Sequence, residues 1–398
     1  MNKPKLLTGF WALILITSAC STANNQPQTD TGCYPPAYEL AYPYKKGKDI
    51  WPRDPSPLPL SESWMPQLSK KEQNDSIYHR VYSIVARNDD EIWTVDQENL
   101  IRYTPTTREI KRYTIKTLEG GEILPYALYV TADNTLWALG DRRVAGEIAP
   151  VLYLSRLNDE LDQFEIIVDE GGVFFNEQGY STYNQILEDK KGMLWMIFSE
   201  KLFRYDPKTN QAEIVVGVEQ GIYLKNSLAL SPSGEMWFTG LRVDEVKDKR
   251  MTAGLRIFRY NPLTEEVQDF FGPPNYKKIV MSNLFFDHRG RLWVDDYGWV
   301  EIPKKGYGQW YEIIRSPIFI AYSRDGDYGY GWARPSPKLE TPDHQIWFPF
   351  GNGLAKLDLN TNQWCLLSTL QIFDIAQDSS NNLWVAAEGQ LYKYDPDN

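Results

Sequence analysis

The stretch Asp287-His288-Arg289-Gly290-Arg291-Leu292-Trp293 decides the architecture of this chain. An Asp and a Gly around a tight turn, followed by an apolar residue and a tryptophan, indicate a turn that leads into a β-strand. The cassette recurs almost unchanged at 189–195, and 233–237 repeats its second half. Looser copies lie at 89–93, 133–137, 343–347 and 381–384, which gives seven in all. An internal repeat of this kind sets the fold before any residue is given a role.

A second motif follows the tryptophans. Its copies are 101–105, 203–207, 258–262 and 392–396, with a weaker one at 356–359. Three of the copies place Asp or Asn directly before Pro, as in Phe203-Arg204-Tyr205-Asp206-Pro207, which suits a type I turn. Further β-rich runs lie on either side, so each unit is predicted to contain four strands and three turns.

The intervals between the repeat tryptophans are 44, 58, 42, 56, 54 and 37 residues. A four-stranded propeller blade takes roughly 40–45 residues, and the longer intervals then contain loop insertions. We therefore predict an all-β fold, a seven-bladed β-propeller of four-stranded antiparallel blades. The tryptophans are expected to fill the space between neighbouring blades; they are Trp93, Trp137, Trp195, Trp237, Trp293, Trp347 and Trp384.

The N-terminus has the pattern of an export signal. Two lysines precede an apolar run at 10–16, and small residues lead to Cys20. Residues 1–19 are predicted to be a signal peptide, and the cysteine resembles the lipidated first residue of a bacterial lipoprotein. The alternative is an ordinary leader in which Cys20 has no role. Residues 20–32 are predicted to be a flexible tether, and Ser21 favours the outer membrane if the cell has one.

Residues 33–78 are predicted to form an arm, and residues 79–398 the propeller. The chain ends after the third strand of the seventh unit, so the missing fourth strand is expected to come from this arm. Residues 37–44 or 62–68 could supply it, and we favour the first. Cys33 and Cys365 could form a disulfide that locks the ring, or could remain two free thiols.

Composition narrows the choice of partners. The chain has 14 Trp and 25 Tyr, which suits strands and packing between blades. The net charge of −11 argues against a nucleic-acid partner. No cofactor and no metal site is expected, since Asp325-Gly326-Asp327 alone is too weak a signal for calcium.

The predicted long loops all fall on one face of the disc. They are the second-to-third connections 140–151, 239–254 and 295–299, and the blade-to-blade connections 169–183 and 316–336. This face is the expected binding surface. Its loops combine aromatic, acidic and arginine side chains, which suit the binding of a glycan or a protein, although the aromatic rings could instead pack the loops onto the disc. The candidate residues are Phe174, Phe175, Tyr180, Asp295, Asp296, Tyr297, Trp299, Tyr322, Arg324, Asp325, Asp327, Tyr328, Tyr330, Trp332 and Arg334.

The repeats, with forms such as 189–195 followed by 202–207, resemble two-component-regulator propeller repeats over most of 79–398. That resemblance implies a sensor domain outside a bacterial membrane. More distantly the repeats resemble streptogramin-lyase propellers, which use paired histidines and magnesium on the loop-rich face. This sequence has only His79, His288 and His344. The last two are expected on the opposite face, so the sequence predicts no histidine pair for metal or general-base chemistry.

The leading hypothesis is a non-catalytic, lipid-anchored module of the bacterial cell envelope, attached to the membrane through Cys20, that binds an unidentified protein or glycan. Catalytic residues are not predicted, because the familiar enzyme motifs are missing. Two alternatives stay open. One is a lyase or a glycan-cleaving enzyme that uses carboxylates among Asp295, Asp296, Asp325 and Asp327. The other is a structural scaffold for envelope assembly.

Overall fold

In the computed structural model, the described residues form seven antiparallel sheets, each of which contains one repeat tryptophan. The structure describes residues 33–34, 83–95, 100–117, 120–142, 151–170, 185–198, 200–243, 256–270, 283–294, 298–302, 309–312, 337–350, 353–368, 372–387 and 390–394.

The sheets are numbered here from one to seven along the chain. Sheet one contains β2 (Ser83–Asn88), β3 (Glu91–Val95), β4 (Leu100–Thr104) and β5 (Glu109–Tyr113). Sheet two contains a short extra strand β6 (Ile115–Lys116), then β7 (Glu122–Val130), β8 (Leu136–Arg142), β9 (Val151–Asn158) and β10 (Gln163–Glu170). Sheet three contains β11 (Ile186–Glu188), β12 (Leu194–Phe198), β13 (Lys201–Asp206) and β14 (Gln211–Val216).

The 3-10 helix η2 (Val218–Gln220) leads into sheet four, which contains β15 (Ile222–Leu230), β16 (Met236–Arg242), β17 (Arg256–Asn261) and β18 (Glu266–Phe270). Sheet five contains β19 (Leu284–Phe286), β20 (Arg291–Val294), β21 (Gly298–Glu301) and β22 (Gln309–Glu312). Sheet six contains β23 (Leu339–Glu340), β24 (Gln345–Phe350), β25 (Gly353–Asp358) and β26 (Gln363–Ser368), with β1 (Cys33–Tyr34) on its outer edge. Sheet seven contains β27 (Ile372–Gln377), β28 (Leu383–Ala387) and β29 (Gln390–Tyr394).

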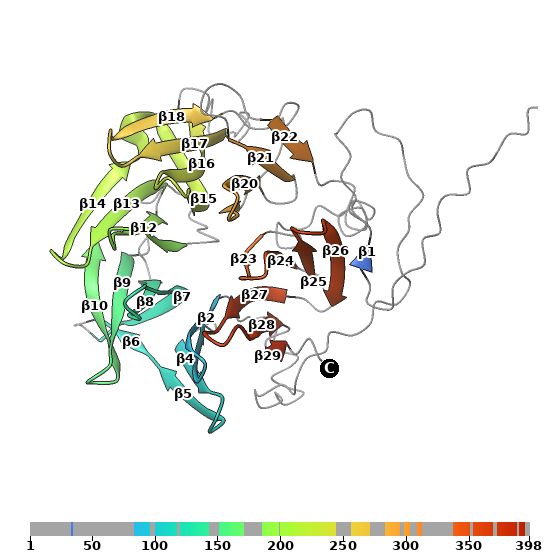
Figure 1. Cartoon of the computed structure of the whole chain (residues 1–398). Coiled ribbons are helices and arrows are strands. Elements are labelled where there is room, and N and C mark those ends of the chain that lie inside the picture. Colours follow the sequence, from blue (N-terminus) through green and yellow to red (C-terminus); the bar gives the residue numbers. More distant parts are fainter. Residues whose placement is uncertain are drawn as a thin grey trace, which may run out of the picture.

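The sheets stand side by side in a ring, with the innermost strands around its middle (Figure 1). The first and last sheets are in contact. Ile84 and Tyr103 of sheet one share a buried cluster with Trp384 and Leu391 of sheet seven. The backbone N–H of Ile84 also donates to the buried carboxylate of Asp374, at 3.0 Å. The fold is therefore an all-β propeller.

Each repeat tryptophan lies on the second strand of its repeat unit and is at most 4% exposed. Two repeated contacts explain the conserved spacing within the motifs. In sheet three, Arg204 stands opposite Trp195 in the register, with its guanidinium 5.5 Å from the ring. Tyr260 of sheet four then meets the same indole at 5.9 Å. Basic residues occupy the opposing position in five other sheets, at Arg102, Arg156, Arg259, Lys356 and Lys393. The indoles thus lie between neighbouring sheets and are packed from both sides.

The aspartate that opens the cassette fixes the turn and the tryptophan together. Asp287 accepts the backbone N–H groups of Arg289 and Arg291 through one oxygen, both at 3.0 Å. Its other oxygen accepts the indole N–H of Trp293 at 2.8 Å. Asp189 with Trp195 and Asp378 with Trp384 repeat the indole bond at 3.0 and 2.9 Å.

Sheet one uses a different carboxylate, since Glu91 accepts the indole N–H of Trp93 at 2.7 Å. The remaining three sheets have no carboxylate in this role. Thr131, Ser231 and Thr341 occupy the corresponding position, and their hydroxyls bond within the turn. Among the residues that the structure describes, the indole nitrogens of these three sheets have no hydrogen-bond partner; they belong to Trp137, Trp237 and Trp347. The repeats therefore keep the shape of the cassette while differing in its polar bonds.

Of the arm, only β1 lies within the described ranges. It pairs with β26, and Cys33 stands opposite Cys365 in the register. Cys365 is disulfide-bonded. The signal peptide, the tether, Cys20 and both candidate closing strands, 37–44 and 62–68, lie outside the described residues. Within the described ranges, no helix has the length and apolar character needed to cross a bilayer.

Candidate functional site

The strand bounds place the predicted loop insertions at one edge of the sheets. Residues 143–150, 244–255 and 295–297 each join the second to the third strand of a repeat unit, and 171–184 and 313–336 join one sheet to the next. In an antiparallel meander these two kinds of connection leave from the same side. The turns between first and second strands leave from the opposite side and are short. One longer connection, 302–308 between β21 and β22, departs from the predicted pattern because it lies on that opposite side.

Most of the residues predicted for the binding surface lie outside the described residues, including Phe174, Phe175, Tyr180, Asp295, Asp296, Tyr297 and all the candidates from Tyr322 to Arg334. The exception is Trp299. It lies on β21, where it stands opposite Trp293 on one side and Tyr311 on the other. The described residues therefore show only the strands that flank the predicted surface, and the surface itself stays a prediction.

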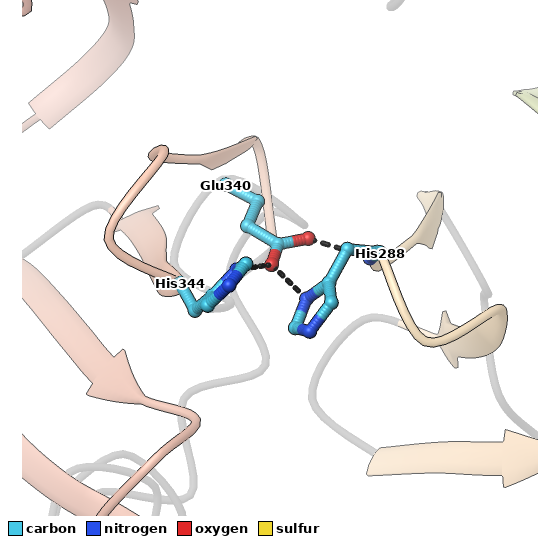
Figure 2. A group of neighbouring side chains, drawn as sticks. All are labelled: His288, Glu340 and His344. Carbon is cyan, nitrogen blue, oxygen red and sulfur yellow. Dashed lines mark hydrogen bonds and ion pairs between the residues drawn. The ribbon is translucent and has the colours of Figure 1, made fainter.

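A different group of chemically active side chains gathers on the opposite face. His288 lies in the turn between β19 and β20, and His344 lies in the equivalent turn between β23 and β24. Glu340 is the last residue of β23. Figure 2 shows the three side chains directed toward one another across the junction of sheets five and six. We call this group the His-Glu-His cluster.

The carboxylate of Glu340 is the centre of this cluster. Its Oε2 accepts the backbone N–H of His288 at 2.7 Å, and its Oε1 contacts Nδ1 of the same residue (Figure 2). Nδ1 of His344 lies 3.4 Å from that Oε1. The two imidazole rings stack, with centroids 3.9 Å apart and planes inclined by 20°. One ligand-type atom from each residue lies within 4.8 Å of the other two.

The cluster is open to solvent on its histidine side. The side chains of His288 and His344 are 35% and 43% exposed, whereas that of Glu340 is 12% exposed. The carboxylate is therefore held in place by the protein, while both rings retain room for an additional ligand.

The prediction that no histidine pair is available is wrong. The sequence predicts both histidines on the face opposite the long loops, but each repeat taken alone does not show that their turns are neighbours. His288 precedes its tryptophan by five residues and His344 precedes its own by three. Equivalent turns of adjacent blades lie side by side, so these offsets carried the signal that the two rings would meet.

Carboxylates elsewhere on this face hold neighbouring sheets together. Asp89 of sheet one accepts the backbone N–H of Ser380 at 2.6 Å and the hydroxyl of Ser379 at 2.7 Å, both from sheet seven. Hydrogen bonds from these serines lower the pKa of Asp89. Asp159 of sheet two pairs with Arg87 of sheet one, and the hydrogen bond from Arg87 lowers the pKa of Asp159. These two carboxylates thus connect neighbouring sheets of the ring.

Comparison with known proteins adds to the description of the fold. No family model matches the sequence, and no curated protein is similar to it. Among solved structures, the chain is similar to YCF48 from Cyanidioschyzon merolae, with a TM-score of 0.53 and 12% identity over 81% of this chain and 97% of that one. It is also similar to the extracellular domain assigned to a hybrid two component system of Bacteroides thetaiotaomicron, with a TM-score of 0.51 and 14% identity.

That second comparison covers 79% of this chain and 40% of the other, so this chain spans less than half of the Bacteroides domain. A streptogramin B lyase matches with a TM-score of 0.49 and 15% identity over 80% of this chain and 94% of the lyase. The likeness to the first two structures supports the propeller fold alone, and residue roles are not transferred at these identities.

Proposed function

We propose that this protein is a non-catalytic recognition module that works outside the cytoplasm and binds a protein or glycan through the face that carries the long connections. The observation that carries this proposal is the position of those connections. Four long connections, 143–150, 171–184, 244–255 and 313–336, leave second or fourth strands, and therefore share one side of the ring. Loops on a rigid scaffold are where binding residues concentrate.

The candidate residues on this face suit such a role. Trp299, Trp332 and the tyrosines near them offer flat apolar surfaces, and Arg324, Arg334 and the aspartates offer hydrogen bonds. Aromatic and arginine side chains dominate the energetics of protein interfaces. The shared fold with extracellular domains of two component systems supports a location outside the cytoplasm.

The finer architecture forms part of the same proposal. Each of the seven sheets is a blade of one ring, the arm supplies the fourth strand of sheet seven, and Cys20 carries a lipid that anchors the chain to the cell envelope. A Cys33–Cys365 disulfide fixes the arm to sheet six. Its support is the register that sets Cys33 opposite Cys365 and the bonded state of Cys365.

A binding screen tests the proposed surface. The chain from residue 21 onward is applied to arrays of glycans and peptides, together with the variants Trp299→Ala and Trp332→Ala. Loss of an aromatic hot-spot residue is expected to weaken binding by about tenfold or more, which corresponds to roughly 1.4 kcal/mol or above. Leu161→Ser is the matched control, because Leu161 is 60% exposed in a turn on the opposite side of sheet two.

Equal binding by both tryptophan variants and the parent chain would remove the proposed surface. The enzyme alternative is separated by replacing Asp295, Asp296, Asp325 and Asp327 with Asn. An enzyme that uses these carboxylates would retain ligand affinity and lose turnover, whereas a recognition module has no turnover to lose.

A further inference from the structure

We propose that His288, Glu340 and His344 form a binding site for a divalent transition metal of the zinc class, which links sheets five and six on the face opposite the long connections. Two imidazoles and one carboxylate are a common ligand set for Zn²⁺, with a further position left for water or another ligand. Imidazole nitrogen is also favoured by Cu²⁺ and Ni²⁺ over the ions that prefer an all-oxygen site.

The observed geometry is close to what such an ion needs. Tetrahedral coordination with bonds near 2.0–2.2 Å sets ligand atoms roughly 3.4 Å apart. Nδ1 of His344 already lies 3.4 Å from Oε1 of Glu340, and all three residues offer an atom within 4.8 Å of the others. Both imidazoles have exposed edges, so a small rotation of either ring brings its nitrogen to the ion without disturbing the core.

A comparison within the ring separates the structural role of Glu340 from the proposed one. Glu188 occupies the equivalent place in sheet three, and its Oε2 accepts the backbone N–H of Ala132 in the preceding turn at 2.7 Å. Oε2 of Glu340 makes the same bond to the backbone of His288, also at 2.7 Å. The clamp between sheets therefore needs one carboxylate oxygen and no histidine. The second oxygen of Glu340 and the two imidazoles beside it are therefore not required for this contact between sheets.

The backbone of His344 gives an independent indication. Its φ is +64°, in the left-handed region. The equivalent turn position is Gly or Asn in the other sheets with this turn, namely Asn134, Gly192, Gly234, Gly290 and Asn381. Gly enters this region at no steric cost, whereas a residue with a larger side chain does so less readily. A histidine here costs stability relative to Gly, which is consistent with a role for its side chain.

The test measures metal binding by the full-length chain without a polyhistidine tag. Zn²⁺ is titrated calorimetrically, and Co²⁺ is followed by its visible absorption, which reports the coordination geometry. We expect one high-affinity Zn²⁺ per chain and a Co²⁺ spectrum of low coordination number. His288→Asn and His344→Gly are each expected to weaken Zn²⁺ binding at least tenfold.

The variant His344→Gly keeps the proposal distinguishable from a folding defect. Because Gly is favoured at this φ, the metal-free variant is expected to be as stable as the parent or more so, while the rise in melting temperature on adding Zn²⁺ disappears. Two control variants are expected to bind Zn²⁺ like the parent. His79→Asn removes the only other histidine of the chain, and Glu188→Gln alters the equivalent clamp in sheet three.

Two results would overturn the proposal. One is the absence of stoichiometric Zn²⁺ binding by the parent chain, which would leave the group as a hydrogen-bonded cluster only. The other is binding that persists unchanged in both His288→Asn and His344→Gly, which would place the ion elsewhere. The recognition surface proposed above lies on the other face, so neither result bears on it.

Discussion

We expect the buried carboxylate of Asp378 to contribute strongly to the stability of sheet seven. It is 5% exposed and accepts hydrogen bonds from four donor groups. Two come from the backbone N–H groups of Ser380 and Asn382, at 3.1 and 2.8 Å, and one from the side-chain amide of Asn382, at 2.9 Å. The fourth comes from the indole N–H of Trp384, at 2.9 Å.

Two substitutions at Asp378 distinguish its hydrogen bond to the indole from its hydrogen bonds within the turn. Asp378→Thr reproduces the arrangement of Thr341, whose hydroxyl serves its turn while the indole of Trp347 has no partner among the described residues. This change removes a buried bond to a charged acceptor, which costs about 2 kcal/mol. Asp378→Ala also removes the acceptor for the turn, so the total loss rises to about 4 kcal/mol.

The measurement is urea unfolding followed by both circular dichroism and tryptophan fluorescence, with free energies taken by linear extrapolation. Ser231→Asp is the reciprocal variant, because it offers the unpartnered indole of Trp237 a carboxylate, and it is expected to raise stability by about 1 kcal/mol. The reasoning is refuted if Asp378→Thr is within about 0.5 kcal/mol of the parent, or if the Thr and Ala variants lose the same amount.

Three further predictions concern the ring. The pKa of Asp89 is lowered from 3.8 in the folded protein, so its bonds to sheet seven stabilise the protein above that pH and are lost as the pH falls further. Asp89→Asn should therefore lower the urea midpoint at pH 7, and the difference from the parent should shrink below pH 3.8; a constant difference would contradict this. Cys365→Ser should cost about 2–5 kcal/mol, and unreduced peptide mapping of the parent should recover a Cys33–Cys365 link, whereas a different partner would contradict the predicted pairing. Gly140→Ala should cost about 2–3 kcal/mol, because a Cβ there would lie 2.7 Å from the carbonyl oxygen of Leu124; unchanged thermal unfolding would show that β7 gives way easily.

The sequence was sufficient to predict the periodic part of this fold. The tryptophan cassettes predicted the second strand of every sheet, because burial of an indole between sheets imposes the same local pattern each time. The Arg and Tyr of the second motif follow from the same contact, since one stands opposite the tryptophan and the other meets the tryptophan of the preceding sheet.

Contacts between repeats were harder to predict. The pairing of β1 with sheet six depends on how the arm crosses the surface, and a proline-rich segment gives no periodic signal for that path. The His-Glu-His cluster depends on the alignment of two adjacent turns, which each repeat read alone does not show. The loop residues of the predicted surface come from several blades, so their mutual arrangement depends on packing that local pattern does not determine.

The junction of sheet one with sheet seven has a consequence for how the protein is made. Ile84 and Tyr103 of sheet one pack against Trp384 of sheet seven. Sheet one is synthesised first, so this apolar side remains uncovered until the last sheet has been synthesised. Nascent chains that end before residue 372 are thus expected to expose an apolar surface on sheet one and not to form a closed, smaller propeller. Molecular chaperones that shield exposed apolar strands would act on this protein during that interval.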